Sequence, residues 1–250
     1  MPKVLIADEM SPKAEEIIKQ RGIDVDVITG LSHDELKNCI AKYDGLVVRS
    51  ATKPNAEILA NANNLRVIGR AGIGVDNVDI NAASERGIVV MNTPFGNSIT
   101  TAEHAIAMMF SLARDIPAAS ESTHAGRWEK SKFMGVELSS KTLGIIGCGN
   151  IGAIVADRAM GLRMKVISYD PYLSVEKALD LGIEKVELNE LYERSDFISL
   201  HTPMTDMTRG IINSEAFSKM KNNVRIINCA RGGLIVEQDL KIAIESGKVA

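Results

Sequence analysis

The stretch T-L-G-I-I-G-C-G-N-I-G, residues 142–152, decides how the rest of this chain is interpreted. It begins as an apolar run suited to a buried strand and ends in the pattern G-x-G-x-x-G at Gly147, Gly149 and Gly152. A helical pattern follows it. A glycine-rich turn between a strand and a helix is typical of doubly wound α/β folds, in which parallel strands alternate with helices.

The same alternation of short apolar runs and helical patterns extends along the whole chain. We expect strands at 4–8, 25–28, 45–49, 67–69 and 88–92, and again at 142–147, 165–170, 196–201 and 224–229. Strands joined by helices form parallel sheets with right-handed crossovers. The expected fold class is therefore α/β, with two Rossmann or flavodoxin-like parallel-sheet domains, residues 1–97 and 98–250, and a cleft between them.

Three local patterns predict individual helices. Pro12–Gln20 is amphipathic, and Ser32 with Glu35 has the S-x-x-E form of a capping box that opens a helix to about Tyr43. A long helix is expected from about Ser98 to Arg114, and its methionines are interpreted as core residues. Its apolar positions recur at spacings of three and four, namely Ala102, Ala105, Ile106, Met109, Phe110 and Ala113.

Composition and charge restrict the class of protein. The chain has 250 residues, of which 45% are hydrophobic and 24% charged, and its net charge is −3. This balance argues against a surface for nucleic acid or for anionic membranes. The three cysteines show no metal-ligand spacing, and no apolar run suits a secretory signal or a membrane span. We expect a cytoplasmic protein with a small-molecule substrate and no metal.

Each glycine of the loop at 147–152 has a separate role in the predicted site. The first allows a tight turn, the second lets the backbone approach a pyrophosphate, and the third permits close helix–strand packing. Asp170 ends the next strand about 20 residues further on, where it can accept hydrogen bonds from ribose hydroxyls. Because its charge repels a 2′-phosphate and Pro171 rather than Arg follows, the motif favours NAD over NADP.

A second glycine stretch, Gly69-Arg70-Ala71-Gly72-Ile73-Gly74, follows the strand at 67–69. It lacks a third glycine at the spacing of a dinucleotide loop. We interpret it as a loop whose bare backbone amides bind a substrate carboxylate or the nicotinamide end of NAD. Spacing alone does not separate this interpretation from a plain turn.

Several stretches together resemble the NAD-dependent D-2-hydroxyacid dehydrogenases, and among them the branch that acts on D-3-phosphoglycerate. They cover essentially the whole chain: VRSATK (48–53), VIGRAGIGVDNVD (67–79), GIVVMNTPFGNSITTAEHAIAMM (87–109), WEKSKFMGVEL (128–138), GIIGCGNIG (144–152), SYDP (168–171), LHTP (200–203) and INCARGG (227–233). The resemblance implies transfer of hydride from D-3-phosphoglycerate to NAD, which yields 3-phosphohydroxypyruvate, the first step of serine biosynthesis.

The resemblance also implies residue roles. Arg231 would be catalytic, holding the substrate carboxylate and polarising the reacting C–O bond, for which a guanidinium fork is suited. Arg49, Ser50, Gly72 and Gly74 would bind substrate. The residues expected to line the NAD site are Ile73, Gly147, Gly149, Asn150, Ile151, Gly152, Asp170, Thr202, Cys229, Ala230 and Arg231.

In the family, a His accepts the hydroxyl proton and a Glu orients that His. The resemblance puts both after Arg231, in segments absent from these 250 residues together with the last strands of the second domain. General acid–base help contributes about 10²–10⁴-fold, so we expect slow or no turnover from this chain alone. The alternatives are an NAD-binding module without turnover and a functionless fragment. None of the four histidines (His33, His104, His124 and His201) is expected to replace the missing base.

Three further residues carry narrower expectations. Cys148 lies near a helix N-terminus, which favours a thiolate. We favour the other interpretation, in which the Cys148 side chain acts as a small apolar group that fills the turn. Trp128 is a candidate contact in a homodimer or homotetramer formed through the cofactor domain, as the family implies, with core packing as the rival. Val236 stands where the family commonly has an Asp that caps the last helix. The lack of this cap should lower the stability of the fold by about 0.5–2 kcal/mol.

Overall fold

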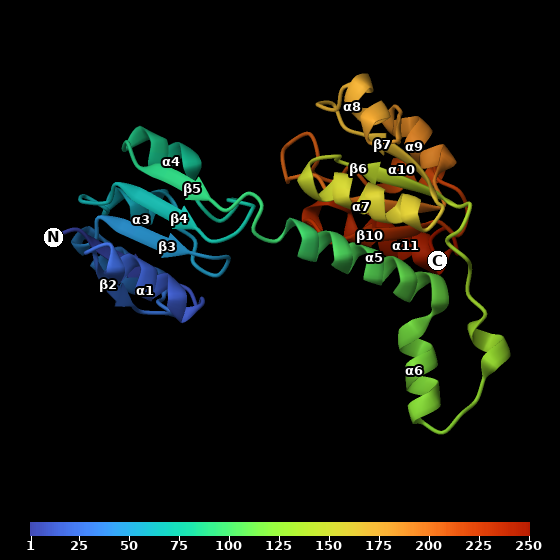
Figure 1. The fold of residues 1–250 in the computed structure, drawn as a ribbon, viewed down its shortest axis with the longest axis horizontal. Coiled ribbons are helices and arrows are strands. Elements are labelled where there is room, and N and C mark those ends of the chain that lie inside the picture. The colour runs from blue at the N-terminus through green and yellow to red at the C-terminus, as the bar shows by residue number, and fades with distance from the viewer. The chain divides into compact units, whose positions relative to one another are not determined.

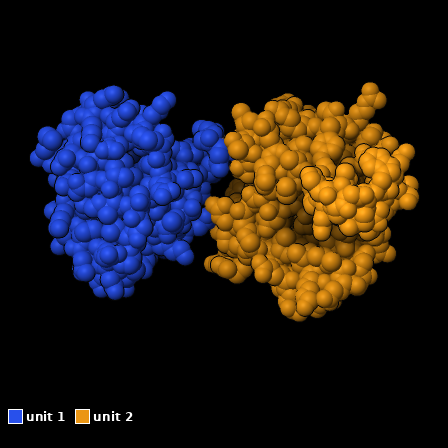
Figure 2. Space-filling view, turned by 90° about the horizontal axis from the view of Figure 1, so that it is seen from below, with its two compact units in different colours: residues 1–97 blue, residues 98–250 orange.

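The computed structural model describes residues 1–250 as two compact units, residues 1–97 and residues 98–250 (Figure 2). Each unit contains one five-stranded sheet in which every strand pair is parallel. The predicted fold class, two parallel-sheet α/β domains, is thus confirmed. No helix combines the length and the apolar character that crossing a membrane requires.

Unit 1 has the strand order β2-β1-β3-β4-β5. Its elements are β1 (Lys3–Ile6), α1 (Pro12–Gln20), β2 (Asp24–Val27), α2 (His33–Cys39), η1 (Ile40–Lys42), β3 (Gly45–Val48), α3 (Ala56–Ala60), β4 (Val67–Arg70), α4 (Ile80–Glu85) and β5 (Val89–Asn92). Strand β1 pairs with β2 on one side and with β3 on the other. The loops that follow β1, β3 and β4 therefore meet at one edge of the sheet.

Local sequence explains where the helices of unit 1 begin. The predicted capping box is present, because Ser32 Oγ accepts from Glu35 N at 3.3 Å while Glu35 Oε2 accepts from Ser32 N at 2.8 Å. These hydrogen bonds hold the pKa of Glu35 below its usual value. The helix that they start ends at Cys39, and a 3₁₀ turn continues to Lys42. Helix α1 has the predicted bounds.

Unit 2 has the strand order β10-β9-β6-β7-β8. Its elements are α5 (Ser98–Arg114), α6 (Ile116–His124), η2 (Lys130–Phe133), β6 (Thr142–Ile146), α7 (Asn150–Gly161), β7 (Lys165–Tyr169), α8 (Val175–Asp180), β8 (Glu184–Lys185), α9 (Leu188–Arg194), β9 (Phe197–Leu200), α10 (Ser214–Lys219), β10 (Arg225–Asn228), η3 (Gly232–Leu234) and α11 (Glu237–Glu245). As expected, Val236 precedes α11 without any side-chain cap.

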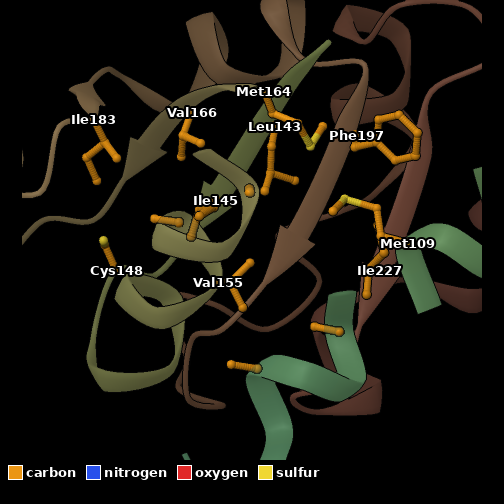
Figure 3. Close-up of a cluster of buried hydrophobic side chains, with 14 of the residues drawn as sticks. Met109, Leu143, Ile145, Cys148, Val155, Met164, Val166, Ile183, Phe197 and Ile227 are labelled. Carbon is orange, nitrogen blue, oxygen red and sulfur yellow. The ribbon is translucent and has the colours of Figure 1, made fainter. Parts of the chain in front are cut away.

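The core of unit 2 packs α5 and α7 against the sheet. Met109 is 1% exposed and lies in the cluster formed by the strands and α7 (Figure 3). The interpretation of the methionines of α5 as core residues thus holds for Met109 and was wrong for Met108, which is 40% exposed. Phe110, which shares the apolar spacing of this helix, is 37% exposed.

Residues 115–135, which we call the arm, follow α5 and project away from the sheet of unit 2 (Figure 1). The arm contains α6 and η2. The chain returns where Val136 N donates to Ala113 O at 2.7 Å. Within the arm, Ser122 Oγ donates to Glu129 Oε2 at 2.6 Å. Trp128 precedes this anchored carboxylate and is 82% exposed. The core-packing alternative for Trp128 was therefore wrong within this chain.

Candidate functional site

The predicted cofactor residues of unit 2 lie at the carboxyl edge of its sheet. The glycine loop follows β6, Asp170 follows β7, and Thr202 and Cys229 follow β9 and β10. These strands are neighbours in the order β10-β9-β6-β7. Because β6 sends its successor β7 to one side and pairs with β9 on the other, the loop lies at the switch point where α/β sheets bind ligands.

Gly147 and Gly152 leave no room for a side chain. A Cβ on Gly147, where φ is +92°, would lie 2.9 Å from the carbonyl of His201 and from Thr202 N. A Cβ on Gly152 would lie 2.2 Å from Gly147 O. The first glycine is thus needed where the ends of β6 and β9 meet, and the third where α7 packs onto the turn.

Gly149 differs, because nothing lies within 4 Å of the position that its Cβ would occupy. It is the N-cap of α7 and provides no side-chain hydrogen bond to the helix. The N–H groups of the first helical turn, which begins with Asn150 and Ile151, have no acceptor within the helix. Bare donors, a positive helix end and an open face fit a pyrophosphate.

Asp170 connects the end of β7 to the loop. Its Oδ2 accepts from Cys148 N at 2.8 Å, and its Oδ1 accepts from Tyr172 N at 2.8 Å. Each carboxylate oxygen has a second lone pair, so the oriented carboxylate can still accept from ligand hydroxyls. The side chain is half-buried.

Burial keeps two other groups beside the loop, Cys148 and His201, uncharged. Cys148 is 4% exposed and belongs to the hydrophobic cluster with Ile145 and Val155 (Figure 3). Burial raises the pKa of its thiol, which opposes the thiolate and agrees with the apolar interpretation. Burial also lowers the pKa of His201 to about 4, and its Nε2 lies 2.8 Å from Ser199 Oγ. A histidine with so low a pKa is deprotonated at pH 7 but is a weak base, and therefore a poor proton acceptor.

Cys229, Ala230 and Arg231 form the turn between β10 and η3. Asn228 organises this turn, since its Oδ1 accepts from Ala230 N at 3.0 Å and its Nδ2 donates to Arg231 O at 2.8 Å. Arg231 has extended backbone, is half-buried and donates from Nη1 to Ala230 O at 2.9 Å. A cationic fork is thereby held at the carboxyl end of the last strand.

A groove of about 650 Å³ runs between α5 and β10 within unit 2. Its lining includes His104, Met108, Asn228 and Cys229. His104 is exposed there. Cys229 is the one predicted cofactor residue that lines this groove.

In unit 1, Arg49 and Ser50 follow β3 on a loop fixed by Asp8, which is 6% exposed. The carboxylate of Asp8 accepts from Arg49 N at 2.6 Å, from Thr52 N at 3.1 Å and from Thr52 Oγ1 at 2.6 Å. Asn77 Nδ2 donates to Arg49 O at 2.8 Å and to Thr52 O at 2.6 Å. The loop that carries Arg49 is therefore held on both sides.

A pocket of about 380 Å³ brings part of the predicted substrate set together. It is lined by Arg49, Ser50, Arg70, Ala71, Gly72, Thr93, Gly96 and Asn97. Gly74 and Ile73 lie outside this lining, and Ile73 O accepts from Asn92 Nδ2 at 2.7 Å.

Sequence reasoning missed Asp8, Asn77 and Arg70. Asp8 could have been found from the sequence, because a carboxylate at the end of an apolar strand of an α/β fold lies at the edge of the sheet where ligands bind. Asn77 and Arg70 stand inside a quoted motif, but only their contacts give them roles. No group of His, Cys, Asp and Glu side chains is arranged to hold a metal ion.

Comparison with known proteins supports the geometry. Residues 106–250 match the family model for the D-isomer specific 2-hydroxyacid dehydrogenase, NAD binding domain. D-3-phosphoglycerate dehydrogenases are similar: the protein from Archaeoglobus fulgidus is 50% identical over 99% of this chain and 47% of its own length, and the human protein is 46% identical over 99% and 46%. The chain thus spans about half the length of these curated relatives.

Solved structures agree with the fold. The TT0316 protein from Thermus thermophilus superposes with a TM-score of 0.90 at 32% identity, covering 99% of this chain and 79% of that one. D-lactate dehydrogenase from Aquifex aeolicus, in complex with NAD and lactic acid, gives 0.89 at 28% identity, covering 98% and 74%. With the glycine loop and its family model in agreement, the chain belongs to the D-isomer specific 2-hydroxyacid dehydrogenases and carries their NAD-binding domain in residues 106–250.

Proposed function

We propose that this chain serves the NAD-dependent oxidation of D-3-phosphoglycerate at C2 to 3-phosphohydroxypyruvate, the first step of serine biosynthesis. The observation that carries the proposal is the glycine loop whose second glycine, Gly149, faces open space at an uncapped helix N-terminus. The similarity to D-3-phosphoglycerate dehydrogenases supports the choice of substrate.

The residues of unit 2 divide the binding of NAD among them. The backbone from Gly147 to Gly152 receives the pyrophosphate, and Asp170 accepts from the adenosine ribose. Thr202, Cys229 and Ala230 line the same sheet edge. When bound, NAD supplies the acceptor for the hydride that leaves C2.

Arg231 holds the substrate carboxylate in our proposal. A guanidinium can donate two parallel hydrogen bonds to a carboxylate and so fix the orientation of the carbon beside it. Arg49, Ser50 and Gly72 receive the other end of the substrate. The assignments of Gly74 and Ile73 stay predictions, since neither lines the pocket at Arg49.

The proton acceptor is the one role that we assign to no histidine of this chain. His201, whose pKa is lowered to about 4, would be deprotonated but too weak a base to accept the hydroxyl proton at pH 7. The second candidate function is an NAD-binding module without turnover, since the open loop at Gly149 supports the binding of NAD in either case.

Two measurements on the 250-residue chain distinguish these functions. Titration with NADH, followed by fluorescence, should show saturable binding that weakens when Asp170 is replaced by Ala. Absorbance at about 340 nm then follows NADH formation from D-3-phosphoglycerate and NAD, a readout of hydride transfer. Binding with no turnover would support the module, and the absence of NADH binding would overturn both functions.

We also propose that the arm, residues 115–135, mediates a homodimer or homotetramer. Exposed apolar side chains on it include Ile116 at 50%, Trp128 at 82% and Met134 at 77%, and buried aromatic anchors dominate the energetics of interfaces. Sedimentation analysis should show that Trp128→Ala lowers the oligomer fraction. Tyr172→Ala, which removes a 94% exposed ring outside the arm, is the control. A monomeric wild type would overturn the proposal.

A cytoplasmic location is the remaining part of the proposal. It is supported by the three cysteines, all of which are free thiols, as suits a reducing compartment. Fractionation of the native source, with a probe for this chain, tests it.

A further inference from the structure

Gly233, in the turn η3 that follows Arg231, is a glycine for reasons of space and not of backbone conformation. Its φ is not positive, so the backbone there would accept a residue with a side chain. A Cβ at this position would lie 2.7 Å from Cε of Met204 and 3.6 Å from its Sδ. The methyl end of Met204 therefore occupies the space that a side chain of residue 233 would need. The neighbouring Gly232 has nothing within 4 Å of an added Cβ, so the contact is specific to one residue of the turn.

Met204 comes from the loop after β9, two residues beyond the predicted cofactor residue Thr202. We call residues 203–212 the brace. The brace is fixed from within, since Thr208 Oγ1 donates to Pro203 O at 2.6 Å. A thioether on an unbranched chain adapts its shape to an irregular gap. The brace thus presents an adaptable side chain from a fixed backbone.

The backbone of the brace also pairs with the chain that follows Arg231. Gly210 N donates to Gly233 O at 2.9 Å, and Ile212 N donates to Leu234 O at 3.0 Å. Leu234 N in turn donates to Arg231 O at 3.3 Å. The side chains of Leu234 and Ile212 are fully buried. The brace and the turn are therefore packed as one body, to which Met204 adds a side-chain contact.

This packing bears on Arg231, which lies two residues before Gly233. Asn228 holds the near side of Arg231 through two hydrogen bonds to the turn, and Met204 packs against the far side. A guanidinium donates two parallel hydrogen bonds to a carboxylate only in one orientation. Such a group has to be held within about 0.5 Å of its productive position. A loose turn would therefore weaken carboxylate binding even with the guanidinium intact.

We propose that Met204 is a positioning residue, which packs against Gly233 and so holds the Arg231 guanidinium in the orientation that the carboxylate of a 2-hydroxy acid needs. Met204 acts through the turn and not through a contact with the substrate. The inference rests on the proposed function, because that function gives the substrate carboxylate to Arg231.

The direct test is amide hydrogen exchange of the full 250-residue chain, followed by mass spectrometry over residues 229–236. Met204→Ala removes the group that packs on Gly233 and should speed exchange in this turn about tenfold, with no change in β9. Gly233→Ala, whose Cβ displaces the Met204 methyl group, should have the same effect.

Two variants control the exchange measurement. Met204→Leu conserves the apolar volume and should exchange as the wild type does. Met207→Ala removes an 82% exposed methionine from the same loop and should also leave the turn unchanged. Thermal unfolding checks that each variant is folded, and if Met204→Ala is not, Gly233→Ala and Met204→Leu carry the test.

The functional test measures affinity by calorimetry on the chain loaded with NADH. 3-Phospho-D-glycerate has the carboxylate that Arg231 holds, whereas glycerol 3-phosphate lacks it. Met204→Ala should weaken 3-phosphoglycerate about tenfold and leave glycerol 3-phosphate and NADH unchanged, and Met204→Leu should restore the wild-type affinity. A merely structural role would lower the melting temperature without moving the ratio of the two affinities.

The outcomes separate the inference from the proposed function. If exchange over residues 229–236 is the same in Met204→Ala as in the wild type, or if both phosphorylated ligands weaken equally, the inference is wrong and the proposed function stands. If the turn exchanges faster in Met204→Ala but the wild type does not bind 3-phosphoglycerate, the positioning of Arg231 is supported and the proposed substrate is wrong. If exchange is unchanged and the wild type does not bind 3-phosphoglycerate, both are wrong.

Discussion

The two glycine stretches of this chain follow parallel strands at equivalent edges of their sheets, yet they use the missing side chains differently. At Gly149 in unit 2 the space that a Cβ would fill is empty. At Gly72 in unit 1 the same space is filled by the guanidinium of Arg70. A glycine after a strand therefore marks a place where something comes close to the backbone, and the neighbouring side chains decide whether that is a ligand or the protein itself.

The groups around the two stretches also differ in their charge. Beside the loop of unit 2, burial keeps Cys148 and His201 neutral, and the one charged group that contacts the loop is the carboxylate of Asp170. The stretch of unit 1 shares its pocket with two arginines. At the loop of unit 2 a helix end and bare backbone donors face the open side, whereas in the pocket of unit 1 the groups suited to an anion carry formal charges.

The largest effect that tests this comparison is the response of unit 2 to acid. The pKa of His201 is lowered to about 4 by burial, whereas an unfolded histidine titrates near 6.5. Below pH 6.5 the unfolded chain binds a proton that the folded chain does not, so stability should fall as the pH drops from about 6.5 to about 4, by on the order of 3 kcal/mol.

Urea unfolding at a series of pH values measures this loss. His201→Gln should flatten the profile between pH 6.5 and pH 4 relative to the wild type. His124→Gln, which removes an exposed ring on α6, is the matched control and should leave the wild-type slope. An unchanged slope in His201→Gln would show that other groups cause the acid sensitivity.

The next effect concerns the third glycine of the loop in unit 2. Gly152→Ala forces a Cβ to within 2.2 Å of Gly147 O, a backbone atom that cannot move aside cheaply. Overpacking of this kind costs about 1–3 kcal/mol, measured by urea unfolding. Gly161→Ala in the same helix has nothing within 4 Å and should instead gain up to about 1 kcal/mol. Equal effects of the two variants would contradict the packing argument.

The third effect separates ligand space from packing space. Gly149→Ala should change the free energy of unfolding by less than about 0.5 kcal/mol, because its Cβ meets no protein atom. It should nevertheless raise the Kd for NADH about tenfold, equivalent to about 1.4 kcal/mol, since the methyl group enters the space of the pyrophosphate. Fluorescence titration with NADH measures this, and unchanged affinity would mean that the pyrophosphate does not pass Gly149.

The strands of both sheets could be predicted because each is a short apolar run bounded by turn residues. The two-residue strand β8 (Glu184–Lys185) was missed, since its sequence is charged and it is assigned only by its pairing with β7. The arm was also missed as a feature: α6 begins after Asp115, which has a left-handed backbone with φ of 50°, and no propensity argument indicates that.

The candidate site was predictable where one motif implies one geometry and was not where contacts between distant residues decide. The roles of Gly147, Gly149 and Gly152 follow from spacing between a strand and a helix. Asp8 is 41 residues from Arg49 in sequence, so only the sheet order shows that they meet. Arg70 lies inside a motif quoted from the sequence, but its environment depends on the space beside Gly72 and on Arg49, which lines the same pocket.

The smallest effect lies at the first glycine of the stretch in unit 1, where the comparison predicts near neutrality. Gly69 is in β4, and the only atom within 4 Å of its added Cβ is Val47 Cγ2 at 3.9 Å, an ordinary van der Waals contact. Gly69→Ala should therefore change the free energy of unfolding by no more than about 0.5 kcal/mol, with a gain favoured because alanine loses less backbone entropy. Gly147→Ala, the equivalent substitution after β6, combines a φ of +92° with backbone contacts at 2.9 Å and should lose more than about 1 kcal/mol. Urea unfolding of the two variants side by side measures the difference. If Gly69→Ala were as costly as Gly147→Ala, Gly69 would be a structural turn residue like Gly147. The contrast between the two stretches would then not extend to their first glycines.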